Sequence, residues 1–354
     1  MRKLLLLGGG YGGMRLLQGL LTDKLPDDVQ ITLVDRMPYH CLKTEFYALA
    51  AGTTSDKHIR MSFPDHQQFS IKNKEITNID MQNNTVYFNN GESESYDDLV
   101  IGLGCEDRYH NVPGASDYTL SIQTIEQSRK ACETLNNVRK NGTVSIVGAG
   151  LSGVELAAEL YESRPDLNIR LFDRGKHILS SLPERISHYV EKWFIEHGVH
   201  IINEANITRV EENVVFNHDE PIDSDAIVWT AGIKPNTIVE DLNVEKDPSG
   251  RVSLTEHHQA LGYDNVFVVG DCASLPYPPS AQLSELQADQ IAAVLSKKWQ
   301  DQSLPELSPI KLKGTFGSLG KKHGFGMMAN TPLTGRVPRL LKSGILWMYK
   351  LQNG

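Results

Sequence analysis

Long apolar runs are missing from this chain of 354 residues. No window approaches the roughly 18 uninterrupted apolar residues that a membrane-spanning helix requires. The apolar stretch that starts at Leu4 is interrupted at Gly8, so we interpret it as a buried strand and not as a signal peptide. A mean hydropathy of −0.32 agrees with a globular protein that is cytoplasmic, or at most peripheral on the cytoplasmic face of a membrane.

Paired cysteines and an excess of basic charge are missing as well. Cys41, Cys105, Cys132 and Cys272 form no CxxC pair and no Cys/His cluster at metal-ligand spacing. This pattern argues against a disulfide framework and against structural zinc, and we expect no metal. The formal net charge of −9 disfavours nucleic acid as a partner, because phosphate binding relies on clustered Lys and Arg.

Two segments of the chain, residues 4–13 and 144–153, follow one plan. Each is a short apolar run, as expected for a strand buried on both faces of a parallel sheet, and ends in G-x-G-x-x-G. Helical patterns follow, from Met14 to about Leu21 and from Val154 to about Glu162. Two copies of the same plan indicate an internal duplication.

Each copy continues into a second strand that ends in an acidic residue, Asp35 or Asp173. The acid follows the third glycine by 22 residues in the first copy and by 20 in the second. This spacing predicts a βαβ dinucleotide-binding fold, in which the acid binds adenosine ribose hydroxyls. Residues 97–104 and 225–232 add a matching pair: an acid, a buried strand and a small-residue turn.

The three glycines of each loop have different physical roles. The first permits the tight turn, the second lets backbone N–H groups approach a pyrophosphate, and the third lets helix and strand pack closely. The helix N-terminus then stabilises the anion. In chain order they are Gly8, Gly10 and Gly13 in the first copy and Gly148, Gly150 and Gly153 in the second.

These motifs, in this order, resemble the two-dinucleotide-domain flavoproteins and, within them, the type II NADH:quinone oxidoreductases. Residues 8–13 resemble the FAD loop of that family, and residues 148–155 its NADH loop. Residues 266–271 are similar to its second FAD signature, and residues 278–282 to the start of the helix under the isoalloxazine ring. The resemblance covers residues 1 to about 330.

The resemblance implies an α/β protein with two Rossmann-like domains. An FAD-binding domain, residues 1–115 and 255–300, is interrupted by an NADH-binding domain, residues 116–254. Residues 301–354 would form a C-terminal region that contacts a protein or membrane surface. The chain is expected to pass from one domain to the other in short, turn-rich stretches.

The resemblance also implies site residues for two cofactors, FAD and NADH. For FAD they are Gly8, Gly10, Tyr11, Gly12, Gly13, Asp35, Arg36, Thr44, Leu103, Gly104, Gly270, Asp271, Ala281 and Gln282. For NADH they are Gly148, Gly150, Leu151, Ser152, Gly153, Asp173, Arg174, Ala231 and Gly232. Asp173 favours NADH over NADPH because it repels a 2′-phosphate, whereas Arg174 would reverse this preference if it turned inward.

Glu155 is the expected catalytic residue. By resemblance it positions NADH and assists proton movement. We expect it within the first turn of its helix, where a carboxylate also stabilises the helix dipole without any catalytic part. His40, beside Cys41, is interpreted as an ordinary polar loop histidine.

The electron acceptor is less closely defined. The family pattern A-Q-x-A-x-Q is interrupted here by Ser284 and Leu286, so the acceptor is a quinone or another small oxidant. Cys41, six residues after Asp35, supports an alternative, a thiol-based NADH peroxidase or coenzyme A disulfide reductase. A non-catalytic flavoprotein redox sensor is the third interpretation.

Residues 336–354 form a basic amphipathic segment. On a helix, Leu341, Ile345 and Met348 lie on one side, between scattered Lys and Arg residues. Such a segment could contact a membrane surface, pack on its own protein or join a second subunit in a homodimer.

Overall fold

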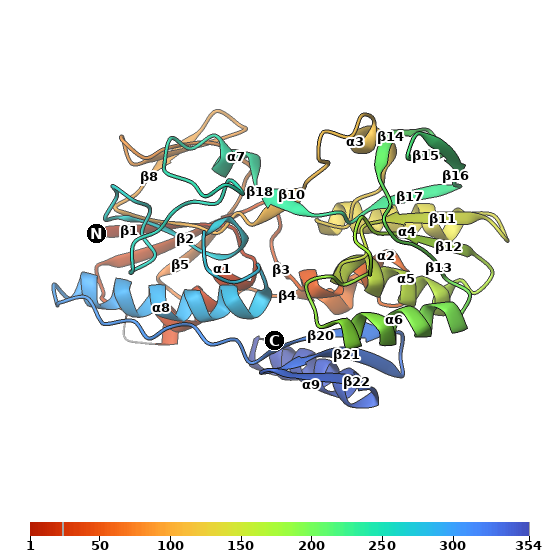
Figure 1. The fold of residues 1–354 in the computed structure, drawn as a ribbon. Helices are drawn as coiled ribbons and strands as arrows, with labels where there is room; N and C mark the ends of the chain where they lie inside the picture. Colours follow the sequence, from red (N-terminus) through yellow and green to blue (C-terminus); the bar gives the residue numbers. More distant parts are fainter. Residues whose placement is uncertain (23–24, 354) are drawn as a thin grey trace. The chain divides into compact units, whose positions relative to one another are not determined.

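The computed structural model describes residues 1–22 and 25–353, which divide into two compact units (Figure 1). Unit 1 consists of residues 1–42, 60–106 and 234–312. Unit 2 consists of residues 43–59, 107–233 and 313–354. Each unit is built around its own parallel sheet.

The unit 1 sheet has the strand order β19-β9-β1-β2-β5, and every neighbouring pair is parallel. The strands are β1 (Arg2–Leu7), β2 (Val29–Asp35), β5 (Phe69–Asn73), β9 (Asp98–Ile101) and β19 (Val266–Val268). Leu4, Leu6 and Val100 on one face pack against two neighbouring helices, α1 (Tyr11–Thr22) and α8 (Ala281–Trp299). Leu5 and Leu7 fill a second core on the other face, as expected for a strand covered on both sides.

The unit 2 sheet repeats this arrangement with the order β13-β12-β11-β17, again entirely parallel. Its strands are β11 (Thr143–Val147), β12 (Asn168–Phe172), β13 (His200–Ile202) and β17 (Ala226–Trp229). The helices of this unit include α4 (Ile125–Asn137), α5 (Leu151–Ser163) and α6 (Glu184–Glu196). Both units therefore contain the same βαβ core.

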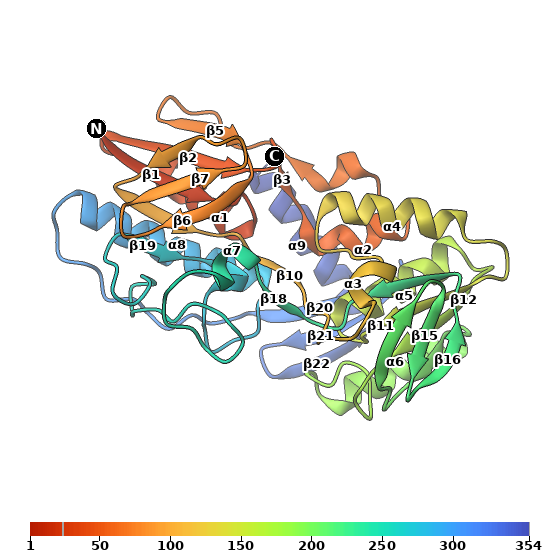
Figure 2. The ribbon, with the colours of Figure 1, turned by 90° about the horizontal axis from the view of Figure 1, so that it is seen from above.

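A small antiparallel sheet is inserted at the same point in each unit, between the third and fourth parallel strands. In unit 1 it comprises β6 (Ile76–Asp80), β7 (Thr85–Phe88) and β8 (Ser93–Ser95). In unit 2 it comprises β14 (Ile207–Glu211), β15 (Val214–Asn217) and β16 (Glu220–Asp223), the last two drawn side by side in green in Figure 2. The duplication thus extends beyond the glycine loops to the whole α/β unit.

Unit 2 also carries a C-terminal sheet of β20 (Gly314–Leu319), β21 (His323–Met328) and β22 (Thr331–Gly335), followed by α9 (Arg336–Asn353), all drawn in blue in Figure 1. On α9, Ile345 and Met348 are exposed, whereas Leu341 is half-buried. The remaining elements are β3 (His40–Cys41), η1 (Lys43–Glu45), α2 (Phe46–Ala50), η2 (Asp56–Ile59), β4 (Arg60–Met61), β10 (Cys105–Asp107), α3 (Ala115–Tyr118), β18 (Ile233–Pro235), α7 (Thr237–Glu240) and η3 (Gly270–Cys272).

The predicted fold class is confirmed, but the helix starts and the domain bounds differ from expectation. Both helices start three residues earlier than predicted, at Tyr11 and Leu151, because the third glycine lies inside the first helical turn. Residues 43–59 and 107–115, expected in the FAD-binding part, lie in unit 2, and residues 301–312, expected in the C-terminal region, lie in unit 1. Residues 234–254 lie in unit 1 and not with the NADH-binding part, since Val239 and Val252 are buried among the unit 1 strands. No helix in the described residues is long and apolar enough to cross a membrane.

Candidate active site

The first glycine loop, in unit 1, requires glycine at two positions. Gly8 has a φ of +97°, and a Cβ there would lie 2.3 Å from the carbonyl oxygen of Gly102. A Cβ on Gly13 would lie 2.1 Å from the carbonyl oxygen of Gly8. At Gly10, by contrast, no heavy atom of the described residues lies within 4 Å of the Cβ position, apart from chain neighbours. The loop is closely packed on one side and open on the other, as a pyrophosphate cradle must be.

The second loop, in unit 2, has the same division. Gly148 has a φ of +106°, and a Cβ there would lie 2.6 Å from the backbone of Ala231. A Cβ on Gly153 would lie 1.9 Å from the carbonyl oxygen of Gly148. Gly150 again faces open space within the described structure. The turn and packing roles predicted for the first and third glycines are therefore visible in both units, and the second position is open in each.

The two acidic residues are held in the same way. Asp35 accepts a hydrogen bond at Oδ2 from the Gly9 N–H at 2.6 Å, and Asp173 accepts one from the Ala149 N–H at 3.1 Å. The other oxygen of each carboxylate accepts the backbone N–H two residues further on, at 2.8 Å and 2.7 Å. Each acid is thus fixed beside its own glycine loop at the end of its strand.

These features fit a dinucleotide in each unit. Backbone N–H groups at the N-termini of α1 and α5 are available for a pyrophosphate, and each acid is placed for a ribose. Arg36 and Arg174, the residues that follow the acids, are both exposed. The expectation that Asp173 favours NADH over NADPH stays a prediction.

Glu155 lies in the second turn of α5, so the expectation of a first-turn carboxylate is wrong: the helix begins at Leu151, earlier than predicted. Its side chain is buried, and Oε1 accepts three hydrogen bonds. The Ser318 N–H donates at 2.7 Å and the Ser318 hydroxyl at 3.0 Å, and the third donor is the Lys342 ammonium. A helix-dipole role alone does not explain this environment.

Lys342, on α9, connects Glu155 to Tyr47 on α2. Its ammonium donates to the Tyr47 hydroxyl at 2.7 Å. Burial alone lowers the pKa of Lys342, but the negative charge of Glu155, followed by the influence of Tyr47 and Glu45, outweighs it and raises the pKa. Burial in turn raises the pKa of Glu45. Lys342, Tyr47 and Glu45 border a cavity of about 240 Å³ together with Leu346 and Trp347. The sequence analysis assigned none of these residues to the site.

Comparison with known proteins supports this reading of the two loops. Residues 2–289 match the family model described as pyridine nucleotide-disulphide oxidoreductase. A Bacillus subtilis relative, the NADH dehydrogenase-like protein YutJ, is 65% identical over the full length of both chains. The chain belongs to the pyridine nucleotide-disulphide oxidoreductase family. The predicted family is confirmed.

More distant relatives and solved structures match along almost the whole chain. The type II NADH:quinone oxidoreductase of Staphylococcus haemolyticus is 24% identical, covering 97% of this chain and 94% of its own. NDH2 from Plasmodium falciparum, solved in complex with NADH, superposes with a TM-score of 0.83 at 17% identity, covering 97% and 94%. The sulfide:quinone oxidoreductase of Aquifex aeolicus gives 0.82 at 18% identity, covering 99% and 91%. At such identities the structures establish the fold alone.

The second FAD signature of the family depends here on a glutamine that sequence reasoning missed. Gln287 is completely buried; it accepts the Gly270 N–H at 2.9 Å and donates to the Val268 carbonyl at 2.9 Å. This holds η3, where Asp271 accepts a hydrogen bond from the Cys105 thiol at 3.0 Å. The sequence signal that could have revealed Gln287 is its position as a polar residue on the apolar face of α8.

The departures from the family pattern lie near the start of α8. Ser280 is the N-cap, and its hydroxyl accepts the Leu283 N–H at 3.2 Å. The Ser284 hydroxyl donates to the Ser280 carbonyl at 3.0 Å, so it is satisfied within the helix. Ala281 and Gln282, the predicted flavin neighbours, form the first residues of α8 and are half-buried.

His40 differs from the expected polar loop histidine. It is completely buried, its Nδ1–H donates to the Gly9 carbonyl at 2.8 Å, and its ring lies edge-on to Tyr11 with centroids 5.1 Å apart. Burial lowers the pKa of His40 to about 4, despite the opposing effect of the Gly9 carbonyl. His40 therefore supports the first glycine loop as a neutral ring.

The remaining predicted site residues fall in their expected units with one exception. Leu103 and Gly104 follow β9, and Gly12 lies in the first turn of α1. Ser152 lies in the first turn of α5, and Gly232, with a φ of +123°, follows β17. The exception is Thr44, assigned to FAD, which is exposed within η1 and belongs to unit 2.

Proposed function

We propose that this protein is an NADH dehydrogenase that oxidises NADH through bound FAD and passes the electrons to a quinone. The observation that carries the proposal is the pair of glycine loops, each with an acid held beside it by the same hydrogen bonds. The full-length similarity to type II NADH:quinone oxidoreductases supports it. In the overall reaction NADH, a proton and a quinone yield NAD⁺ and a quinol.

The two cofactors supply the hydride chemistry, and the protein orients them. Asp173 would accept the ribose hydroxyls of NADH, while the N–H groups at the start of α5 would bind its pyrophosphate. Asp35 and the N-terminus of α1 would hold FAD in the same way. Gln287 keeps the Gly270 backbone in place, and with it Asp271.

The cluster around Glu155 supports the quinone as acceptor. A quinone that takes up two electrons gains negative charge at its oxygens before it is protonated. Lys342 stays positively charged because its pKa is raised, so its ammonium would stabilise that charge. Tyr47 and Ser318 extend the hydrogen-bonded chain from that ammonium, with the two hydroxyls 3.3 Å apart. The neighbouring cavity is lined by Lys342 and Tyr47 together with Leu346 and Trp347, a lining suited to a flat ring with carbonyl groups.

The outer face of α9 supports contact with an anionic membrane surface, where quinones are found. Six of its apolar side chains are 54% to 71% exposed: Val337, Leu340, Ile345, Trp347, Met348 and Leu351. Lys342 and Arg339 lie on the inner face. The exposed Arg336 at the start of the helix adds basic charge beside this apolar stripe, the pattern of an interfacial helix. Vesicles rich in anionic lipid should shift the fluorescence of Trp347 to the blue; an unchanged spectrum together with a dimeric mass would indicate subunit contact instead.

An anaerobic titration tests the central proposal. The purified chain should carry the absorption bands of oxidised flavin, lose them with one equivalent of NADH and recover them when a soluble quinone is added. The Glu155→Gln variant should show slower recovery, whereas Glu196→Gln, at an exposed position of α6, should not. A colourless protein that takes up no FAD would overturn the proposal. Bleaching without recovery by any quinone would favour the redox-sensor interpretation.

A further inference from the structure

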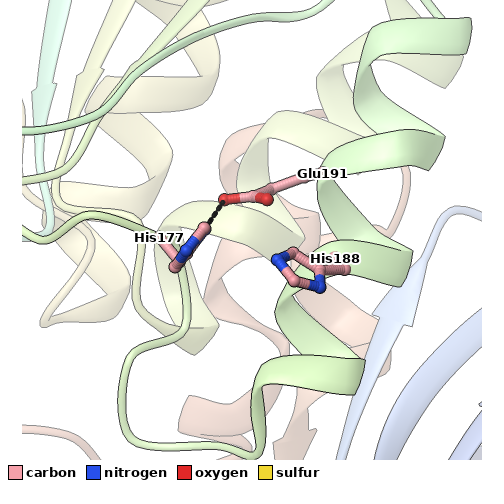
Figure 3. Close-up of side chains that lie close together, drawn as sticks. All are labelled: His177, His188 and Glu191. Carbon is pink, nitrogen blue, oxygen red and sulfur yellow. Dashed lines mark hydrogen bonds and ion pairs between the residues drawn. The ribbon is translucent and has the colours of Figure 1, made fainter.

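Two histidines and a glutamate converge on the surface of unit 2, outside the site described above. They are His177, which precedes α6, and His188 and Glu191 on the helix itself (Figure 3). One ligand atom from each lies within 4.8 Å of the other two. The pair His177 Nδ1 and Glu191 Oε1 is 3.3 Å apart, close to the ~3.3 Å edge of a tetrahedron with zinc bonds of about 2.05 Å.

The local sequence explains why these groups meet. His188 and Glu191 are three positions apart on α6, so they project from the same face of the helix. His177 is fixed by its neighbours Ile178 and Leu179, both buried in the unit 2 core. Glu191 also accepts hydrogen bonds from the Ile178 N–H at 3.3 Å and the Asn203 amide at 3.4 Å, which orient its carboxylate.

A fourth group, Glu184, lies beside the cluster. Its Oε1 is 3.8 Å from Nε2 of both His177 and His188. Two imidazoles and a carboxylate are a ligand set typical of zinc and similar transition-metal ions. Magnesium and calcium prefer all-oxygen ligands, and copper(I) prefers sulfur, so both classes fit less well.

The loop that carries His177 also connects to the second glycine loop. It starts at Asp173, whose carboxylate accepts the Gly175 N–H at 2.7 Å and the Ala149 N–H at 3.1 Å. Further along, the Leu179 N–H donates to the Ala149 carbonyl at 2.9 Å. Any ion that ties His177 to α6 would therefore stiffen the segment that positions Asp173.

We propose that His177, His188 and Glu191 form a binding site for a zinc-class divalent ion, with water completing the coordination, and that occupancy tightens NADH binding by ordering the Asp173 loop. This departs from the expectation of no metal, which rested on cysteine spacing and on ligands adjacent in sequence. The coupling part rests on the NADH site proposed above, whereas the metal site itself does not.

A metal titration tests the site directly. The full-length chain, freed of any affinity tag and treated with a chelator, is titrated calorimetrically with Zn²⁺ and by visible absorption with Co²⁺. We expect one equivalent to bind, and at least tenfold weaker binding in His188→Asn and in Glu191→Gln. His58→Asn, at another exposed histidine of unit 2, should bind as the unaltered chain does. Equal affinity in all variants, or no binding at millimolar Zn²⁺, would overturn the proposal.

The coupling is measured as the dissociation constant of NADH with and without one equivalent of Zn²⁺. We expect about fivefold tighter binding with the ion, within the range of ordinary coupling between sites, and no change in His188→Asn. An unchanged constant in the presence of bound Zn²⁺ would reject the coupling. Failure of NADH to bind under either condition would instead contradict the proposed function, while the metal titration would still stand.

Discussion

Lys342 on α9 donates a hydrogen bond to Glu155 on α5, although the two residues are 187 positions apart in the chain. Their side chains are only 14% and 8% exposed, so both charges are largely shielded from water. A buried pair of this kind contributes little net stability by itself, but removal of one partner leaves an uncompensated charge. The C-terminal helix is therefore coupled to the residue expected to act beside NADH.

Replacing Lys342 by Met should lower the free energy of unfolding by about 3 kcal/mol, because the Glu155 carboxylate would remain buried without its cation. Urea unfolding followed by tryptophan fluorescence measures this. The Glu155→Gln/Lys342→Met double variant should lose less than the sum of the single losses. Lys192→Met, at an exposed position of α6, should change stability by less than about 0.5 kcal/mol. Additive losses in the double variant would contradict the pairing.

Substitution of the third glycine of each loop should affect one cofactor and not the other. In Gly13→Ala the new Cβ would meet a backbone oxygen at 2.1 Å, and in Gly153→Ala at 1.9 Å, so either loop would have to move. Gly13→Ala should be purified with little flavin, whereas Gly153→Ala should retain flavin and bind NADH at least tenfold more weakly. Gly344→Ala, where the Cβ position is open, is the matched control. Loss of flavin from both loop variants alike would mean general unfolding and would refute the assignment.

Asp173 should determine the choice between NADH and NADPH. Asp173→Asn removes the charge that repels a 2′-phosphate and leaves the exposed Arg174 nearby. The ratio of kcat/KM for NADPH to that for NADH should rise at least tenfold, equivalent to about 1.4 kcal/mol. Asp219→Asn, an exposed site in the same unit, should leave the ratio unchanged. An unaltered ratio in Asp173→Asn would refute the assignment of Asp173 as the residue that binds the ribose.

His40 should make stability depend on pH in a defined window. The unfolded histidine binds a proton below about pH 6.5, whereas the folded one does so only near pH 4. Between these values the unfolded state binds more protons, so stability falls as the pH falls, by up to about 3 kcal/mol. Unfolding of the unaltered chain and of His40→Gln, compared from pH 7 to pH 4.5, should show a smaller loss in the variant. Parallel curves would contradict the buried neutral ring.

Replacing Cys41 by Ser should leave most of the NADH–quinone activity, since the proposed reaction uses no thiol. In the described part of the chain none of the four cysteines forms a disulfide, and burial raises the pKa of Cys272 to about 12, which makes that thiol inert. The measurement is steady-state NADH oxidation with quinone and, separately, with peroxide. Abolished turnover in Cys41→Ser would instead support the thiol-based alternative. Cys272→Ser is the control variant and should keep its turnover.

Local patterns were sufficient to predict which residues come together within one βαβ unit. The glycine loops, their acids and the strands between them depend on short-range geometry, so spacing alone placed Gly8 and Asp35 together, and likewise Gly148 and Asp173. The helix starts were less accurate, because a glycine inside the first turn does not look helical in sequence. The burial of His40 was not predicted, because the local sequence around a histidine in a polar stretch does not show which distant segments pack over it.

The sequence by itself determined the duplication, the two dinucleotide loops and their acids, because hydrophobic period and glycine geometry act over a few residues at a time. Only the tertiary structure decided that Lys342, Tyr47 and Ser318 surround Glu155, that Gln287 supports the second FAD signature, and that His177 meets His188 and Glu191. These residues lie far apart in the chain, or on a loop and a neighbouring helix. Core packing brings them together, and no local sequence pattern encodes that packing.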